Sequence, residues 1–254
     1  IKDDAGTPLM LPVTDLGLQV NQPKPSPTSV LQEIAGLYIA IYDRAVDANG
    51  MSYWVGITSH QPDAKGLTLG TAATTPISAN DAALLGQSIL LAESNYYNQV
   101  YAHLNDASFV NALYLNLGGT NGDPGGLAYW QKSLQALEDS GLSVQVARAS
   151  VVGSFVRDLI STDLTQWVNV LTADQMIAAV HRQAAVVNKI AVSMAYENAS
   201  AGSGGSIFNA KIVGDAAFNA EVRLINSVNS DPSTVSTAII GIYNAITHQD
   251  LSLI

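Results

Sequence analysis

The sequence contains no cysteine among its 254 residues. Disulfide bonds, zinc sites built on thiolates, iron–sulfur clusters and cysteine nucleophiles are therefore excluded. Charged side chains are also scarce, at 13% of the chain, which is about half of ordinary usage. Because apolar residues make up 48%, the surface must consist largely of neutral polar side chains.

Basic side chains are outnumbered by acidic ones, 11 against 21, which gives a formal net charge of −10. A nucleic-acid-binding surface needs a basic patch, and the sequence has no cluster of Lys and Arg. The same scarcity argues against direct attraction to anionic lipid. No apolar run is long enough to predict a membrane span. The chain begins at Ile1 without the pattern of a signal peptide, so we expect a processed form or a fragment.

Proline is concentrated in residues 1–27, which hold five of the nine prolines. The segment 23–27 reads PKPSP and is predicted to be stiff and polyproline-like. We interpret 1–27 as an extended arm, which is either a flexible linker or a clamp that docks on a neighbouring subunit. A free linker seldom carries many apolar side chains, and docking is favoured by six of them: Leu9, Leu11, Val13, Leu16, Leu18 and Val20.

Helical periodicity begins at Thr28, and strand signals are weak throughout. The sequence therefore predicts an all-α fold, a helical bundle or short superhelix with an extended N-terminal arm. A helical repeat domain is expected over 28–200 and C-terminal helices over 201–254, after the flexible break AGSGGS. Expected N-caps include Asn80 or Asp81, Asp106, and Thr172 in a capping box with Gln175. The predicted helices are about 30–42, 50–60, 80–104, 106–117, 124–140, 143–160, 172–198, 215–228 and 233–247.

A repeat becomes visible when the chain is shifted by 76 residues against itself, which places Asp47 on Asp123 without a gap. Both copies have an Asp three residues before a Gly, and that Gly three residues before Tyr-Trp. Such a repeat predicts one helix–turn–helix unit used twice, at about 30–60 and 106–140. The matching residues are Leu37, Tyr38, Asp47, Gly50, Tyr53 and Trp54 in the first copy, and Leu113, Tyr114, Asp123, Gly126, Tyr129 and Trp130 in the second.

This pattern, together with Arg44 in the first copy, resembles the bacterial domain of unknown function 4214 family, which is similar to the phycobilisome linker domain. The second copy departs from it, because Thr120 stands where Arg44 does. The segment 188–192, NKIAV, is also similar to the segment that follows such repeats in S-layer-like proteins. Family members occur in S-layer-like and type I secreted proteins, so the resemblance implies an extracellular location at the bacterial cell surface.

The acidic residues of the two turns have two interpretations. Asp47 and Asp123 precede the second helix of each unit, where a carboxylate caps free N–H groups and meets the positive end of the helix dipole. Alternatively the turns bind calcium, which is the only candidate cofactor. Neither turn fits the ligand positions of an EF-hand loop. The candidate calcium ligands are Asp43, Asp47, Asn49, Asn121 and Asp123.

The aromatic residues of the repeat also have two interpretations. Trp54 and Trp130 are expected to anchor the helices of each unit, with their N–H groups bonded to carbonyls. Alternatively they belong to a platform on which sugar rings stack. Arg44 is expected to pair with Asp47 or Asp43 across the turn, or else to contact a phosphate or an acidic sugar. Further aromatic surface for a sugar would come from Tyr42, Tyr96, Tyr97 and Tyr101.

Patterns that indicate catalysis are poor. The four histidines lie far apart, Gly-x-Ser-x-Gly does not occur, and the Gly-rich stretch at 202–205 follows no predicted strand. We therefore expect no enzymatic activity. The chain ends in DLSLI at 250–254, which is either similar to the C-terminal signal of type I secreted proteins or an ordinary apolar plug.

Together these observations lead us to expect an exported bacterial surface protein that self-assembles into an S-layer-like sheet, a filament or a matrix. Its expected partner is another copy of itself, bound through the N-terminal arm. The alternative is a glycan-binding anchor that attaches a surface assembly to lipopolysaccharide or capsule.

Overall fold

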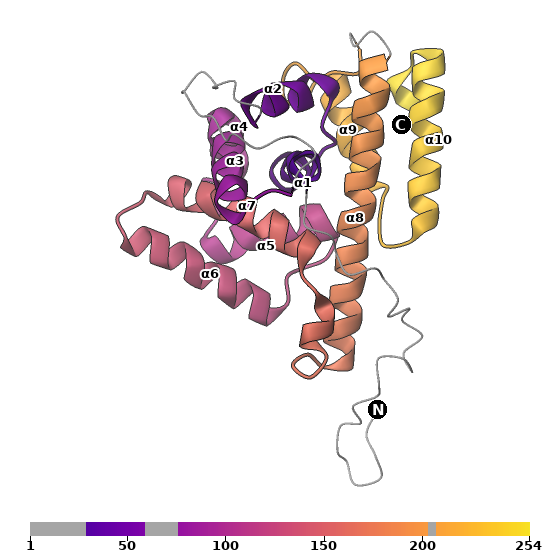
Figure 1. Ribbon diagram of the computed structural model, residues 1–254. Coiled ribbons are helices and arrows are strands. Elements are labelled where there is room, and N and C mark those ends of the chain that lie inside the picture. Colours follow the sequence, from indigo (N-terminus) through magenta and orange to yellow (C-terminus); the bar gives the residue numbers. More distant parts are fainter. Residues whose placement is uncertain (1–28, 59–75, 203–206) are drawn as a thin grey trace, which may run out of the picture.

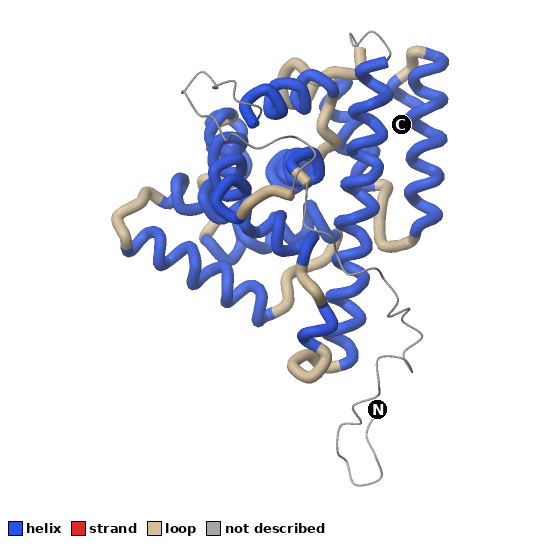
Figure 2. Tube along the Cα trace, viewed as in Figure 1, coloured by secondary structure: helices blue, strands red, loops and turns tan. Residues whose placement is uncertain are grey.

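The computed structural model describes residues 29–58, 76–202 and 207–254, and within these ranges it contains ten α-helices, two short 3-10 helices and no strand. The predicted all-α class is confirmed, and Figure 2 shows helices connected by loops. In Figure 1 the long helix α8 stands between α10 on one side and the earlier helices on the other. The expected assembly arm, with its apolar residues between Leu9 and Val20, lies outside the described residues.

The first repeat unit consists of α1 (Val30–Tyr42) and α2 (Ala48–Thr58). Ser29 caps α1 in a capping box with Gln32. Only Leu31 and Gln32 of this helix lack a buried side chain, so α1 runs through the centre of the molecule, where Figure 1 shows it end-on. The second helix begins at Ala48, two residues before the predicted start at Gly50.

The single helix predicted over 80–104 is wrong, because the chain forms α3 (Ala79–Ala92) and α4 (Ser94–Val100) instead. The backbone leaves the helical conformation at Glu93, with φ −107° and ψ 60°. After this break Tyr97 and Tyr101 are both buried, and the Tyr101 hydroxyl donates to the Ile41 carbonyl at 2.6 Å. The contact of Tyr101 with α1 requires a change of direction that a continuous helix does not provide.

Two predicted helix caps are also wrong. Ser78, rather than Asn80 or Asp81, caps α3. The second repeat unit consists of α5 (Asp106–Gly118) and α6 (Pro124–Asp139), and Asn105 caps α5 by accepting the Ser108 N–H at 2.8 Å. Asp106 instead accepts two bonds from the Arg148 guanidinium, at 2.8 and 3.0 Å. In each case a side chain one to three positions earlier reaches the free N–H groups, and in α5 this leaves Asp106 available for a tertiary ion pair.

The remaining elements are α7 (Val144–Ser161), η2 (Leu164–Trp167), α8 (Ala173–Gly202), α9 (Ala216–Asn226), α10 (Pro232–His248) and η3 (Leu251–Leu253). The predicted capping box of α8 is confirmed, since Thr172 and Gln175 each accept the other's backbone N–H, at 3.3 and 2.9 Å. The helix continues to Gly202, beyond its predicted end near Asn198. Within the described ranges, no helix is both long and apolar enough to cross a membrane.

The two repeat units face each other at equivalent positions. Asn116 of α5 donates its side-chain amide to the Ala40 carbonyl of α1 at 2.9 Å, and these residues are 76 apart, which is the repeat offset. Contact between equivalent positions is what a pair related by an approximate two-fold axis produces. The helices that follow each unit also touch, since α3 and α7 cross backbone to backbone at Gly86 and Gly153.

The C-terminal helices complete the same core. Phe218, Leu224 and Ile225 of α9 are buried in it, and α10 packs along α8. The tail also folds onto the body, because the Arg223 guanidinium donates to the carbonyls of Leu251 and Ile254 at 3.1 and 3.2 Å. Leu251 and Ile254 are partly buried against the core, whereas Leu253 is 44% exposed.

Candidate binding sites at the two repeat joints

The first joint, defined as the turn 43–47 with the residues that pack on it, is organised around Tyr38. Asp47 accepts the Gly50 N–H at 2.8 Å, which is the predicted capping role. A Cβ atom on Gly50 would lie 2.4 Å from the Tyr38 hydroxyl oxygen, so only glycine lets this hydroxyl reach the start of α2. The Trp54 Nε1–H donates to the same hydroxyl at 3.2 Å. Its partner is therefore a tyrosine hydroxyl and not the carbonyl expected from the sequence.

The second joint, at 119–123, repeats this arrangement closely. Asp123 accepts the Gly126 N–H at 2.8 Å, and a Cβ on Gly126 would again lie 2.4 Å from a tyrosine hydroxyl, that of Tyr114. The rings of Tyr129 and Trp130 meet edge to face at 4.9 Å, as do those of Tyr53 and Trp54. The leucines of the motif, Leu37 and Leu113, are fully buried beneath the two joints. The six shared positions thus hold one geometry twice.

The arginine of the first joint has a replacement in the second. The Arg44 guanidinium lies over the Tyr38 ring at 4.8 Å and pairs with Asp47 at 3.1 Å. In the second joint, Arg182 of α8 lies over the Tyr114 ring at 4.9 Å and pairs with Asp123 at 3.2 Å. The loss of an arginine at Thr120 is therefore compensated from another helix. Sequence reasoning missed Arg182 because it lies 59 residues from Asp123. The only signal was the arginine missing from the second copy.

Arg44 also joins the repeat to the C-terminal helices. Its guanidinium pairs with Glu221 of α9, a fully buried residue that the sequence did not single out. The pKa of Glu221 is raised to about 8, because burial, with a smaller contribution from Asp47, outweighs the opposing effect of Arg44. The alternative partner, Asp43, instead accepts from the Asn226 amide at 2.8 Å. Arg44 is thus shared between two carboxyl groups in the interior, which corresponds to the structural pairing predicted for it.

The structure gives protein partners to most of the candidate calcium ligands. Burial alone would raise the pKa of Asp123, but the Gly126 N–H and Arg182 outweigh it and lower this pKa below its ordinary value. The Asn121 side-chain oxygen accepts from Asn111 at 2.7 Å. Asn49 is exposed, and its backbone N–H donates to Asn209. In the part of the chain that the structure describes, no group of three or more acidic or histidine side chains could hold a metal ion. Calcium binding by Asp43, Asp47, Asn49, Asn121 and Asp123 stays an untested prediction.

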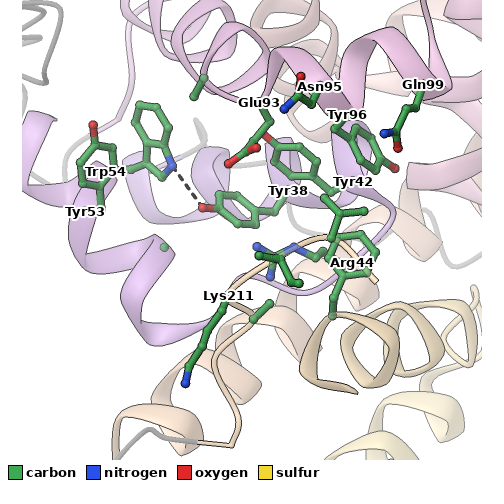
Figure 3. A pocket seen from close by; sticks show the side chains of 16 residues that line it. Tyr38, Tyr42, Arg44, Tyr53, Trp54, Glu93, Asn95, Tyr96, Gln99 and Lys211 are labelled. Atoms are coloured by element: carbon green, nitrogen blue, oxygen red, sulfur yellow. Dashed lines mark hydrogen bonds between the residues drawn. The ribbon is translucent and has the colours of Figure 1, made fainter. Parts of the chain in front are cut away.

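A cavity of about 640 Å³ opens beside the first joint and is named here the first cavity. Figure 3 shows Tyr38 and Tyr42 between Trp54 on one side and Tyr96 on the other. Of the four tyrosines expected to add aromatic surface, Tyr42 and Tyr96 line this cavity, whereas Tyr97 and Tyr101 are buried elsewhere in the core. The polar side chains around it are Arg44, Glu93, Asn95, Gln99 and Lys211.

A second cavity of about 540 Å³ opens beside the second joint. The floor of this cavity is formed by the residues of the second joint that are equivalent to those lining the first cavity, which are Tyr114, Gly126, Tyr129, Trp130 and Arg182. Its outer wall is more apolar, because it is built from the end of α7, from η2 and from the turn that follows. That wall includes Leu159, Leu164, Trp167, Val170 and Leu171. Each joint is thus also the floor of a cavity of ordinary ligand-binding size.

The chain matches no known protein family, no curated protein and no solved structure in the three comparisons made. The resemblance to the domain of unknown function 4214 family therefore depends on the repeat residues and on the segment 188–192. What the two cavities can bind follows from their geometry. The first cavity offers aromatic rings beside planar polar groups, and the second has exposed apolar side chains around it.

Proposed function

We propose that this chain is a non-catalytic structural protein of a bacterial cell surface, which self-assembles into an ordered layer, filament or matrix. The observation that carries the proposal is the outer face of α10. Ile239, Ile240 and Tyr243 are exposed there by 42%, 61% and 71%. The helix sequence PSTVSTAIIGIYNAITH contains no Asp, Glu, Lys or Arg.

An uncharged face is informative in a chain with a net charge of −10. Copies of a protein with this net charge repel one another, so an interface between them is easiest to form where neither partner carries charge. Three large apolar side chains that become buried on association contribute roughly 1.5–3 kcal/mol each, before the cost of ordering is subtracted. The same face on two copies provides a self-complementary, two-fold contact.

The proposal is tested by placing positive charge on this face. The variant Ile240→Lys with Tyr243→Lys should weaken self-association at least tenfold, because each copy would bury two ammonium groups against two others. The matched control is Gln135→Lys with Ala136→Lys, which adds the same charge on the exposed face of α6. Sedimentation velocity and electron microscopy of the full chain give the readout. Equal assembly by wild type and both variants would refute a role for α10.

The first cavity favours a second candidate function, binding of surface glycan. Sugar rings stack on exposed aromatic faces and bond to planar polar side chains, and this cavity offers both kinds of group. Tyr53 is 51% exposed at its edge, whereas Trp54 is only 4% exposed. A stacking role therefore belongs to Tyr53, and Trp54 mainly holds the joint.

The glycan proposal has a matched control inside the repeat. Tyr53→Ala should weaken binding to purified capsule or lipopolysaccharide glycan by about tenfold, because it removes a stacking ring. Tyr129→Ala removes the equivalent residue from the second joint and should leave that affinity unchanged. Calorimetric titration of the full chain measures both. Equal affinities for wild type and Tyr53→Ala would argue against glycan binding at the first cavity.

A further inference from the structure

The second cavity has an apolar rim that nothing in the described structure covers. Tyr129, Trp167 and Val170 are exposed by 61%, 45% and 66%. They approach from two directions, since Tyr129 is on α6 whereas the other two lie on and just after η2. Large apolar side chains gathered around a cavity of about 540 Å³ indicate a site that is occupied by an apolar group in the working protein.

We infer that the second cavity binds the apolar N-terminal segment, residues 9–20, of a second copy of this chain. The inference rests on the proposed self-assembly and supplies it with a contact separate from α10. Between Leu9 and Val20 only Asp15 is charged, so the other side chains of this segment meet the apolar part of the cavity lining at little desolvation cost. The remaining lining is polar and includes Asp123, Asp158, Arg182 and Gln183. The apolar side chains of the segment form two runs of alternate residues, Leu9, Leu11 and Val13, then Leu16, Leu18 and Val20. In an extended segment each run lies on one face and the two runs lie on opposite faces, so the second run can enter the cavity as a unit.

The sequence between this segment and the first helix favours docking on another copy. Residues 21–28 read NQPKPSPT, and three prolines in eight positions predict a stiff, extended spacer. Such a spacer spans about 25 Å at ~3.1 Å per residue. A stiff spacer does not fold back readily on itself, which favours a site on a neighbouring copy over one beside the start of α1. An arm on one copy and a cavity on the next form a head-to-tail contact, which propagates along a chain of subunits.

The test uses full-length variants in the background of Ile240→Lys and Tyr243→Lys, so that the α10 contact does not contribute. The arm variant carries Leu16→Asp and Leu18→Asp. The cavity variant carries Tyr129→Asp and Val170→Asp, whose wild-type side chains are mostly exposed and are therefore not needed for folding. Circular dichroism checks that each variant is helical.

Each variant alone should lose the association that remains in the background protein. An equimolar mixture should regain it as a one-to-one pair and no longer species, because one intact arm then meets one intact cavity. Sedimentation velocity distinguishes these species. As a second measurement, excess synthetic peptide of residues 5–22 should dissociate assemblies of the background protein, whereas the same peptide with Leu16→Asp and Leu18→Asp should not.

The inference is overturned if both variants associate as the background protein does, or if the mixture forms no pair. Docking of the arm on its own body is one way to reach the second result. The proposed self-assembly survives either outcome if the α10 substitutions weaken assembly of the otherwise unchanged chain. Conversely, if only the arm and cavity variants reduce assembly, the α10 contact is wrong and the arm contact stands.

Discussion

In the second joint, Arg182 of α8 takes the place that Arg44 has in the first joint. This equivalence can be tested by removing the guanidinium from α8 and restoring one in the turn. In Arg182→Ala, the second joint loses a group that is 7% exposed and that bridges α8 to the turn. Three bonds disappear, to the Thr120 hydroxyl at 3.3 Å, the Asn121 carbonyl at 3.0 Å and the Asp123 carboxylate at 3.2 Å. The stacking contact with Tyr114 is also lost.

The size of the effect depends on which of these contacts is shielded from water. The side chain of Asp123 is 33% exposed, so its ion pair with Arg182 adds little once solvent screening is considered. The bond to the carbonyl and the contact with the ring contribute roughly 1–2 kcal/mol each. We therefore expect the free energy of unfolding to fall by about 3 kcal/mol. Arg44→Ala should cost more, roughly 3–5 kcal/mol, because it leaves two buried carboxyl groups without their shared partner.

The swap is completed by Thr120→Arg, which restores the arrangement of the first copy. In the Arg182→Ala background it should recover about 1 kcal/mol or more, because the vacated place above Tyr114 is then filled from the turn. In the wild-type background it should give no gain, since the place is already occupied by a like charge. Urea unfolding followed by circular dichroism measures all four chains. Additive effects of the two substitutions would refute the replacement, because independent sites show no coupling.

Two further predictions concern the core around the joints. Gly153→Ala should lower the free energy of unfolding by roughly 1–3 kcal/mol or more, since its Cβ would lie 1.7 Å from the Ala82 carbonyl oxygen. Gly56→Ala is the control, because its Cβ would have nothing within 4 Å, and it should raise the free energy of unfolding by about 0.5–1 kcal/mol. The same urea experiment measures both. The pKa of Glu221 is raised from 4.5 to about 8 in the folded chain, so the unfolded chain releases this proton at a lower pH than the folded chain does. The contribution of Glu221 to the free energy of unfolding is therefore fully present below pH 4.5 and is lost, by a few kcal/mol in all, as the pH rises to 8. Glu221→Gln should flatten that part of the pH profile, and an unchanged slope would assign it to other groups.

Local sequence signals predicted the joints well because their contacts lie within one unit. Asp47 caps α2 as predicted, by accepting the N–H of Gly50 three residues away. Trp54 anchors the helices of its unit, although its N–H donates to the Tyr38 hydroxyl, sixteen residues away, and not to the carbonyl that was predicted. The break at Glu93 was missed because local periodicity continues through it. The reason for the break is a contact between Tyr101 and Ile41, 60 residues apart. Arg182 and Glu221 were missed for the same reason, since each completes a joint from a helix distant in sequence.

The two cavities show why the repeat identifies architecture better than ligand. Their floors agree closely, since the glycine, tyrosine and tryptophan contacts recur with nearly the same distances. Their outer walls come from unrelated elements, which are α4 and the segment before α9 in one case, and η2 with its following turn in the other. A repeated joint therefore provides two similar hollows, and the surrounding helices give each its own chemistry. It follows that substitutions in the floor should affect folding of either unit alike, whereas substitutions in the walls should separate glycan binding from self-assembly.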